Sequence, residues 1–230
     1  MAIHLLRDLD HLKKQVLVVG SLVEEATDKA ISALVDRRPA LAEEVLRGDD
    51  RIDRKEVEVE EECLKILALH QPVAADLRFI ITVLKVNNDL ERMGDLAVNV
   101  AERAAFLSTH EPLSVRVDFP AMGALVRSML RDGLDALVRL DTDLARAVWS
   151  RDDEVDHANR TIRDTLEDLM QSDPGSVERA LHTLSASRSL ERMADHATNI
   201  AEDVLFMVLG EVARHRFRHY LGRNLGPPRA

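Results

Sequence analysis

The sequence LERMGDLAVNVAE, residues 90–102, returns almost unchanged as LERMADHATNIAE, residues 190–202. Nine of the thirteen positions are identical at this shift of 100 residues. Farther upstream the shift is 103, where the pattern DDxxD occurs at residues 49–53 and again at 152–156. A self-similarity of this length indicates that the chain contains two copies of one supersecondary unit.

Prolines divide the chain into long stretches with helical periodicity. A proline interrupts a helix because it lacks the backbone N–H and its ring clashes with the preceding turn. In the first stretch, apolar residues recur at steps of four and three from Leu5 to Leu34, which is the pattern of a buried helix face. We therefore predict six helices, three in each repeat, near residues 3–37, 40–70, 73–108, 120–140, 142–171 and 175–220.

The composition favours a helical protein over a sheet protein. The chain has 230 residues, of which 46% are hydrophobic and only 3% are aromatic. Leu, Ala, Glu and Arg, which are good helix formers, outnumber the β-branched and aromatic residues that fill strands. We predict an all-α fold of two tandem three-helix bundles, with one repeat at residues 1–110, a second at 118–222 and a tail at 223–230.

Charge and hydropathy exclude several functional classes. The formal charge of −10 disfavours binding to nucleic acid, whose phosphates require a basic surface. No apolar run reaches the roughly 20 residues of a membrane span, and the N-terminus lacks a secretion signal, so we expect a cytoplasmic protein without membrane insertion. Cys63 has no second cysteine to pair with and is predicted to be a core residue. A basic stretch at residues 214–218 is expected to complement the dipole at the end of the last helix.

Acidic residues lie in pairs on the second and third helices of the first repeat. Asp49 and Asp53 are four residues apart, as are Glu91 and Asp95, so each pair occupies one face of its helix. In an antiparallel hairpin, residues at equal distances from the turn lie side by side. Both cross-helix pairs are centred on Pro72, so Asp49 should face Asp95 and Asp53 should face Glu91.

The second repeat has the same arrangement. Asp152 should face Asp195, and Asp156 should face Glu191, because both pairs are centred between residues 173 and 174. Carboxylates stacked in this way repel one another. The occurrence of the pattern in both repeats therefore predicts a compensating cation in each.

Four carboxylates from two helices offer oxygen ligands suited to Mg²⁺, Mn²⁺ or iron. Zinc is also possible through the carboxylates and His196. Asn99 and Glu102 share the same helix face and are secondary candidates. The alternative interpretation is that the acids cap helices, pair with Arg92 and Arg192, or face solvent.

The two repeated segments, the Gln71–Arg78 turn and the two DDxxD patterns together resemble the PhoU family across essentially the whole chain. The resemblance implies two three-helix bundles and metal clusters held by E/DxxxD motifs. It also implies a homodimeric negative regulator of the phosphate regulon that links the ATPase subunit of a phosphate ABC transporter to a PhoR-type histidine kinase. The motif residues that correspond to metal ligands are Asp49, Asp53, Glu91, Asp95, Asp152, Asp156, Glu191 and Asp195.

The two repeats differ beyond these motif residues. Along the second helix, the first repeat continues its acidic stripe through Glu56 and Glu60, whereas the second repeat has Asn159 and Arg163. The two sites are therefore not expected to be identical in occupancy or in the number of ions held.

Two other functions are compatible with the sequence. One is an accessory or scaffold protein of a different phosphate transporter. The other is a carboxylate-bridged di-metal enzyme, which would require two inward Glu-x-x-His pairs in one bundle. Glu154-x-x-His157 occurs once and has no counterpart in the first repeat. We find no nucleophile set or nucleotide-binding loop, and we expect a protein that is not an enzyme.

Overall fold

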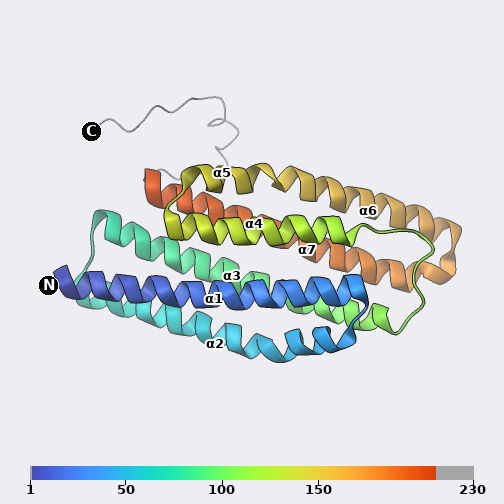
Figure 1. The fold of residues 1–230 in the computed structure, drawn as a ribbon, viewed down its shortest axis with the longest axis horizontal. Helices are drawn as coiled ribbons and strands as arrows, with labels where there is room; N and C mark the ends of the chain where they lie inside the picture. The colour runs from blue at the N-terminus through green and yellow to red at the C-terminus, as the bar shows by residue number, and fades with distance from the viewer. Residues whose placement is uncertain (1, 211–230) are drawn as a thin grey trace.

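In the computed structural model, the described residues 2–210 form helices joined by turns and by one longer linker between Ser108 and Phe119, with no strand among them. Figure 1 shows an elongated bundle in which the long helices run along the long axis. This confirms the all-α fold with two repeats. The first repeat consists of α1 (Ala2–Asp36), α2 (Pro39–His70) and α3 (Ala74–Ser108). The second consists of α4 (Phe119–Arg139), α5 (Thr142–Ser150), α6 (Asp152–Ser172), the 3₁₀ turn η1 (Pro174–Ser176) and α7 (Val177–Leu209).

The repeated segments lie on α3 and α7, which pack against each other at the centre of the molecule (Figure 1). Leu90 and Met93 on α3 are completely buried, as are their counterparts Leu190 and Met193 on α7. The two three-helix units therefore share one continuous hydrophobic core. The burial of apolar surface between the repeats joins them into one folding unit.

Polar contacts also cross the interface between α3 and α7. Lys85 Nζ lies 2.9 Å from Asp203 Oδ1, and Asp203 is 2% exposed. Asp89 Oδ1 accepts hydrogen bonds from His196 Nδ1 at 2.8 Å and from Asn199 Nδ2 at 3.2 Å. Buried polar groups of this kind require their partners, so these contacts fix how α7 lies against α3.

Both hairpin tips lie where the sequence places them. In the first repeat, α2 ends at Gln71, which adopts a left-handed conformation with φ 46° and donates its backbone N–H to Leu67. Pro72 follows, and α3 begins at Ala74. In the second repeat, η1 forms the turn between α6 and α7. The predicted centres of the two hairpins are therefore confirmed.

The predicted helix 142–171 is wrong in one respect, because it is broken in two at Arg151. The Arg151 guanidinium reaches across to α4, where it lies 2.6 Å from Asp132 and 3.3 Å from Ser128. The helix restarts at once, and Asp152 is the first residue of α6. Acidic residues in this first turn are favoured by the positive end of the helix dipole.

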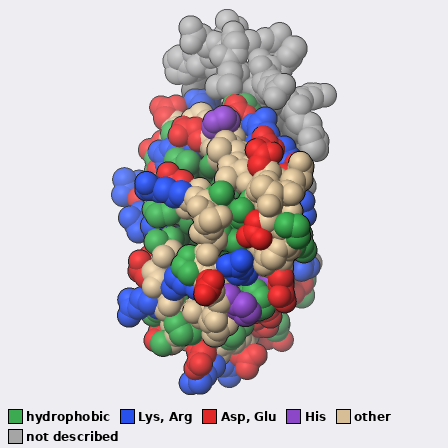
Figure 2. All heavy atoms as spheres, turned by 90° about the vertical axis from the view of Figure 1, so that its right-hand side faces the viewer, with side chains coloured by type: hydrophobic (Ala, Val, Ile, Leu, Met, Phe, Trp, Pro, Cys, Tyr) green, Lys and Arg blue, Asp and Glu red, His purple; other side chains and the backbone are tan. Residues whose placement is uncertain are grey.

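Two arginines hold the linker between the repeats at one end of the molecule. Arg37, which follows α1, donates to the carbonyls of Leu107 and His110. Arg179 of α7 donates to the carbonyls of residues 111 and 112 at 3.0 and 3.3 Å. Figure 2 views this end of the molecule and shows acidic and basic side chains interspersed among hydrophobic ones.

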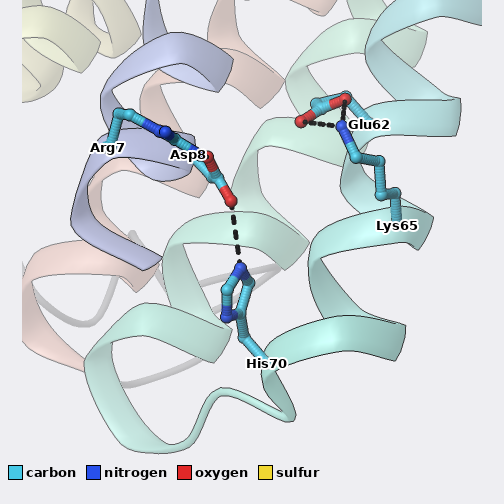
Figure 3. Close-up of polar contacts among 5 residues, drawn as sticks. All are labelled: Arg7, Asp8, Glu62, Lys65 and His70. Atoms are coloured by element: carbon cyan, nitrogen blue, oxygen red, sulfur yellow. Dashed lines mark hydrogen bonds and ion pairs between the residues drawn. The ribbon is translucent and has the colours of Figure 1, made fainter. Parts of the chain in front are cut away.

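At the opposite end, the start of α1 is tied to the end of α2 (Figure 3). The Nε2 atom of His70 donates to Asp8 Oδ2 at 3.0 Å. This hydrogen bond, together with Arg7, lowers the pKa of Asp8 below its ordinary value. Lys65 pairs with Glu62 one turn earlier on α2.

Cys63 is fully buried in α2, and burial raises the pKa of its thiol to about 12, which confirms its role in the core. No helix among residues 2–210 is both long enough and apolar enough to cross a membrane. The predicted end of the last helix beyond Gly210, the basic stretch at 214–218 and the tail at 223–230 lie outside the described residues.

Candidate metal centre

The four predicted carboxylates of the first repeat lie on facing stretches of α2 and α3, close enough for their charges to act on one another. Asp49 lies on α2, and its pKa is raised by burial and by the charges of Asp53 and Asp95. Glu91 lies on α3, and its pKa is raised by burial and by the charges of Asp95, Asp53 and Asp49. Each acid is thus within electrostatic range of its predicted partner on the other helix.

Close packing of α2 on α3 places these carboxylates at the same height. Gly94 lies between Glu91 and Asp95 on α3 and faces Ile52 of α2, which lies between Asp49 and Asp53. A Cβ atom on Gly94 would approach Ile52 to 3.3 Å, a tight contact. The absence of a side chain at residue 94 therefore lets the two acid-bearing helices approach each other.

Arginine partly neutralises the first cluster. The Arg92 guanidinium lies 3.3 Å from Glu91 and 3.5 Å from Asp95. The Arg92 side chain is 55% exposed, and exposed ion pairs contribute little to stability. The alternative interpretation, that the acids pair with arginine, is thus confirmed for Arg92. A cation bound by Glu91 and Asp95 would have to displace this exposed side chain.

Glu56 extends the first cluster beyond the four predicted residues. Its pKa is raised by burial and by the charges of Glu60, Glu91 and Asp53. Asn87 of α3 donates to the Glu56 side chain at 3.3 Å and to its backbone carbonyl at 2.9 Å. The acidic stripe in the sequence was the signal for this residue, although it does not belong to the four-acid motif.

The largest pKa shift among the cluster carboxylates lies in the second cluster. Burial and the charges of Asp195 and Asp156 raise the pKa of Asp152 to about 6. Thr198 Oγ1 donates to Asp152 Oδ1 at 3.4 Å. The pKa of Glu191 is raised by burial and by Asp156 and Asp152, and that of Asp195 by burial, Glu191 and Asp156. Thr198 has no counterpart in the motif, since Val98 occupies the equivalent position in the first repeat.

The clusters differ where the sequence predicts a difference. The position equivalent to Glu56 is Asn159, which accepts a hydrogen bond of 2.7 Å from Ser187. The first cluster therefore has one more carboxylate than the second. Because an amide carries no charge, the two clusters attract cations unequally.

None of the secondary candidates is shown at a cluster. The Nδ1 atom of His196 is occupied by Asp89 in the interface between the repeats. Glu102 pairs with Arg103 at 3.2 Å, and Asn99 is exposed. Glu154 and His157, the pair that suggested a di-metal enzyme, are both exposed on α6 and do not point into the bundle.

The donor set fits a hard cation by its chemistry. The charges within each cluster, together with burial, raise the carboxylate pKa values, so a bound cation would relieve an unfavourable interaction. In the described part of the chain, however, no three His, Cys, Asp or Glu side chains are arranged to hold a metal ion. Their role as metal ligands stays a prediction.

The fold and the clusters together define a class of protein: a helical protein of two repeats with a group of carboxylates between the second and third helices of each. The family model described as "PhoU domain" matches the chain twice, at residues 16–104 and 119–204. The chain belongs to the PhoU family.

Curated relatives and solved structures agree with this membership. A PhoU homolog of the phosphate-specific transport system from Aquifex aeolicus is 41% identical over 92% of this chain and 96% of its own length. The Pseudomonas aeruginosa homolog is 42% identical over 90% of this chain and 86% of its own length. The crystal structure of PhoU from Pseudomonas aeruginosa matches with a TM-score of 0.87 at 40% identity, covering 89% of this chain and 99% of the other. PhoU from Streptococcus pneumoniae matches with a TM-score of 0.84 at 29% identity, covering 90% and 98%.

Proposed function

We propose that this chain is an accessory protein of a phosphate transport system that regulates phosphate uptake by binding to other proteins. The curated relatives carry the name "phosphate-specific transport system accessory protein" and are similar over nearly their whole length. Similarity of this extent covers both repeats and both acidic clusters, and it is the observation that carries the proposal.

The regulation is negative: the protein reduces phosphate uptake and the phosphate-starvation response when phosphate is ample. Its partners are the ATPase subunit of a phosphate ABC transporter and a PhoR-type histidine kinase, and it acts as a homodimer in the cytoplasm. These finer assignments rest on the family resemblance. Helix faces are common docking surfaces for protein partners.

We further propose that metal ions bound by the carboxylates have a structural role. Asp49, Asp53, Glu91 and Asp95 would hold one ion or cluster, and Asp152, Asp156, Glu191 and Asp195 another. Iron, Mg²⁺, Mn²⁺ and Zn²⁺ are the candidate ions. A cation between α2 and α3, or between α6 and α7, would hold the two helices of that hairpin together.

The test uses cells that lack this protein, grown with ample phosphate. We expect the phosphate-starvation response to be switched on, and the wild-type chain to switch it off again. A tagged chain should retrieve the transporter ATPase and the kinase. An unchanged response with neither protein retrieved would favour a scaffold or an accessory of a different transporter.

The acidic clusters are tested in the same cells. A chain with all eight predicted ligands replaced by Asn or Gln should fail to restore repression. The matched control replaces Asp50 and Asp153, which are exposed neighbours of the clusters, with Asn. If the cluster variant represses as well as the control, the metal sites are not needed for regulation.

A further inference from the structure

The outer face of α2 combines exposed apolar side chains with exposed carboxylates. Within residues 2–210, the helices that pack against α2 are α1 and α3, and α2 lies at the edge of the bundle (Figure 1). Leu46, Val57 and Leu64 on this helix are 40%, 49% and 56% exposed. They share one line along the helix, because they belong to a series with steps of four and three residues. This series, which we call the outer seam, consists of Leu46, Asp50, Asp53, Val57, Glu60 and Leu64.

The carboxylates of the outer seam are not neutralised by basic side chains. Asp50, Asp53 and Glu60 are exposed and form no ion pair within residues 2–210. The same holds for Glu61, which lies beside the seam. Single exposed apolar residues are ordinary on protein surfaces, but a line of them among unpaired acids indicates an interaction site.

The basic residues near the outer seam have other partners. Three of them on α2 form ion pairs with carboxylates outside the seam: Arg47 with Glu43, Lys55 with Glu58 and Lys65 with Glu62. Arg51 lines the groove between α1 and α2, and Arg54 donates to the backbone carbonyl of Asp50 at 2.9 Å. On α3, Arg92 lies against two carboxylates of the first cluster. The seam therefore stays acidic, and residues 49–62 contain eight acidic and three basic residues.

The second repeat shows that the fold does not require these residues. The shift of 103 residues gives the counterparts on α6: Arg160 for Val57, Arg163 for Glu60 and Glu167 for Leu64. Arg163 pairs with Asp164 at 3.2 Å and with Glu167 at 3.8 Å. The equivalent face of α6 thus balances its own charges and is polar at all three positions. Because both hairpins fold in the same way, the apolar and acidic seam of α2 serves something other than packing.

The charge of the outer seam determines which class of partner fits it. A second copy of the same seam, an anionic membrane surface and a nucleic acid would each bring further negative charge. A helix with Lys or Arg beside an apolar stripe brings both the complementary charge and the apolar surface. From Leu46 to Leu64 the seam is about 27 Å long at about 1.5 Å per residue, which is enough for a partner helix of about five turns.

We propose that the outer seam of α2 binds a basic amphipathic helix of a partner protein. Leu46, Val57 and Leu64 contact its apolar stripe, and the seam carboxylates pair with the Lys or Arg side chains that flank this stripe. The inference rests on the proposed function, in which the chain acts by binding other proteins, and it adds the face that binds and the chemistry of the bound segment. Repression in cells tests the proposed function and peptide binding tests the seam, so either can fail without the other.

A synthetic peptide is the probe for this face. It contains Leu at steps of three and four and Lys at the other positions, it is about five helical turns long, and it carries a fluorescent label. Its affinity for the full-length chain is measured by anisotropy in the presence of a chelator, because Asp53 is also a predicted metal ligand. A peptide of the same composition in scrambled order controls for attraction by charge alone.

The triple variant Val57→Arg/Glu60→Arg/Leu64→Glu gives α2 the residue types of α6, so it should fold as wild type does. We expect it to bind the peptide about tenfold more weakly or worse, because it removes two apolar contacts and reverses one charge. The matched control is Val177→Arg/Glu178→Arg/Leu181→Glu, which makes the same three changes at exposed positions of α7. The control should bind as tightly as wild type.

Three outcomes would overturn the proposal. One is an equal affinity of the two triple variants, and another is equally tight binding of the scrambled peptide. The third is a dimer of wild type that the α2 variant loses in sedimentation equilibrium, which would show that a second copy covers the seam.

The converse experiment transfers the seam to the second repeat. Arg160→Val/Arg163→Glu/Glu167→Leu gives α6 the residue types of α2, next to acids that are already present at the positions equivalent to Asp50 and Asp53. This variant should bind about two peptides per chain where wild type binds about one. An unchanged stoichiometry would contradict the proposal, because the same apolar and acidic pattern on an equivalent helix would then not bind the probe.

Discussion

Asp152 occupies a position where two electrostatic effects oppose each other. It begins α6, and a helix N-terminus favours a negative charge by about 0.3–1 kcal/mol. Its pKa is nevertheless raised from 3.8 to about 6 by burial and by Asp195 and Asp156. A shift of this size is on the order of 2 kcal/mol once solvent screening is allowed for, so the local crowding outweighs the dipole.

The sign of this shift predicts a pH dependence for the metal-free protein. Between pH 4 and about 6 the folded protein binds a proton at Asp152 that the unfolded chain releases. Ionisation of Asp152 therefore destabilises the fold as the pH rises through this range. We expect chelator-treated wild type to gain stability relative to Asp152→Asn when the pH falls from 7 to 5.

Urea unfolding of the two proteins at pH 7, 6 and 5 measures this difference. Acids whose pKa is lowered, such as Asp8, make the fold less stable as the pH falls. They contribute equally to both proteins, so their effect cancels in the difference. A constant difference across the three pH values would show that Asp152 titrates as it does in the unfolded chain.

Within the helices, replacing either of two glycines with alanine should change the stability of the protein in opposite directions. Gly123 of α4 packs against Ile31 of α1, where a Cβ atom would approach a methyl group to 2.6 Å. Ile31 is 1% exposed, so it has little room to move, and Gly123→Ala should destabilise the protein by about 1–3 kcal/mol. Gly48 of α2 has no atom within 4 Å of that position, so Gly48→Ala should stabilise it by about 0.5–1 kcal/mol.

The free energy of unfolding in urea distinguishes the two. If Gly123→Ala proved as stabilising as Gly48→Ala, then α1 and α4 would not be in the close contact that joins the repeats here.

The break between α5 and α6 gives another prediction. Arg151→Ala removes a partly buried ion pair with Asp132 that joins the break to α4. We expect a loss on the order of 1–2 kcal/mol, because the remaining carboxylate is half-buried. Arg146→Ala on α5 is the control, since its partner Asp143 is 90% exposed, and its effect should be below about 0.5 kcal/mol. Equal effects of the two substitutions in thermal unfolding would show that Arg151 does not hold the break.

The helices differ in how well the sequence predicts them. Pro39, Pro72 and Pro174 mark helix boundaries correctly, because a proline limits a helix by local chemistry alone. The break at Arg151 has no such local cause, since it depends on a side chain of α4 that only the tertiary structure brings near. Periodicity continues across the break and therefore predicts a single helix.

For the whole molecule, the internal repeat carries most of the predictive information. It predicts the two hairpins and the meeting of the carboxylates, because antiparallel pairing follows from the turn positions. It does not predict the contact of His196 with Asp89 or the hydrogen bond from Thr198 to Asp152. Both depend on how α7 is rotated about its axis against its neighbours, which residue spacing alone does not determine.

We propose that the two carboxylate clusters bind metal ions that stabilise the fold. The most direct measurement is the metal content and melting temperature of chelated protein titrated with Mg²⁺, Mn²⁺, Zn²⁺ or Fe²⁺. Wild type should gain thermal stability with metal, because a cation that binds only the folded state stabilises it by mass action. Replacing Asp49, Asp53, Glu91 and Asp95 with Asn or Gln should remove about one site. The variant lacking all eight acids should melt above metal-free wild type and respond to no metal. A metal-dependent rise in melting temperature that survives in that variant would show that the metal binds elsewhere.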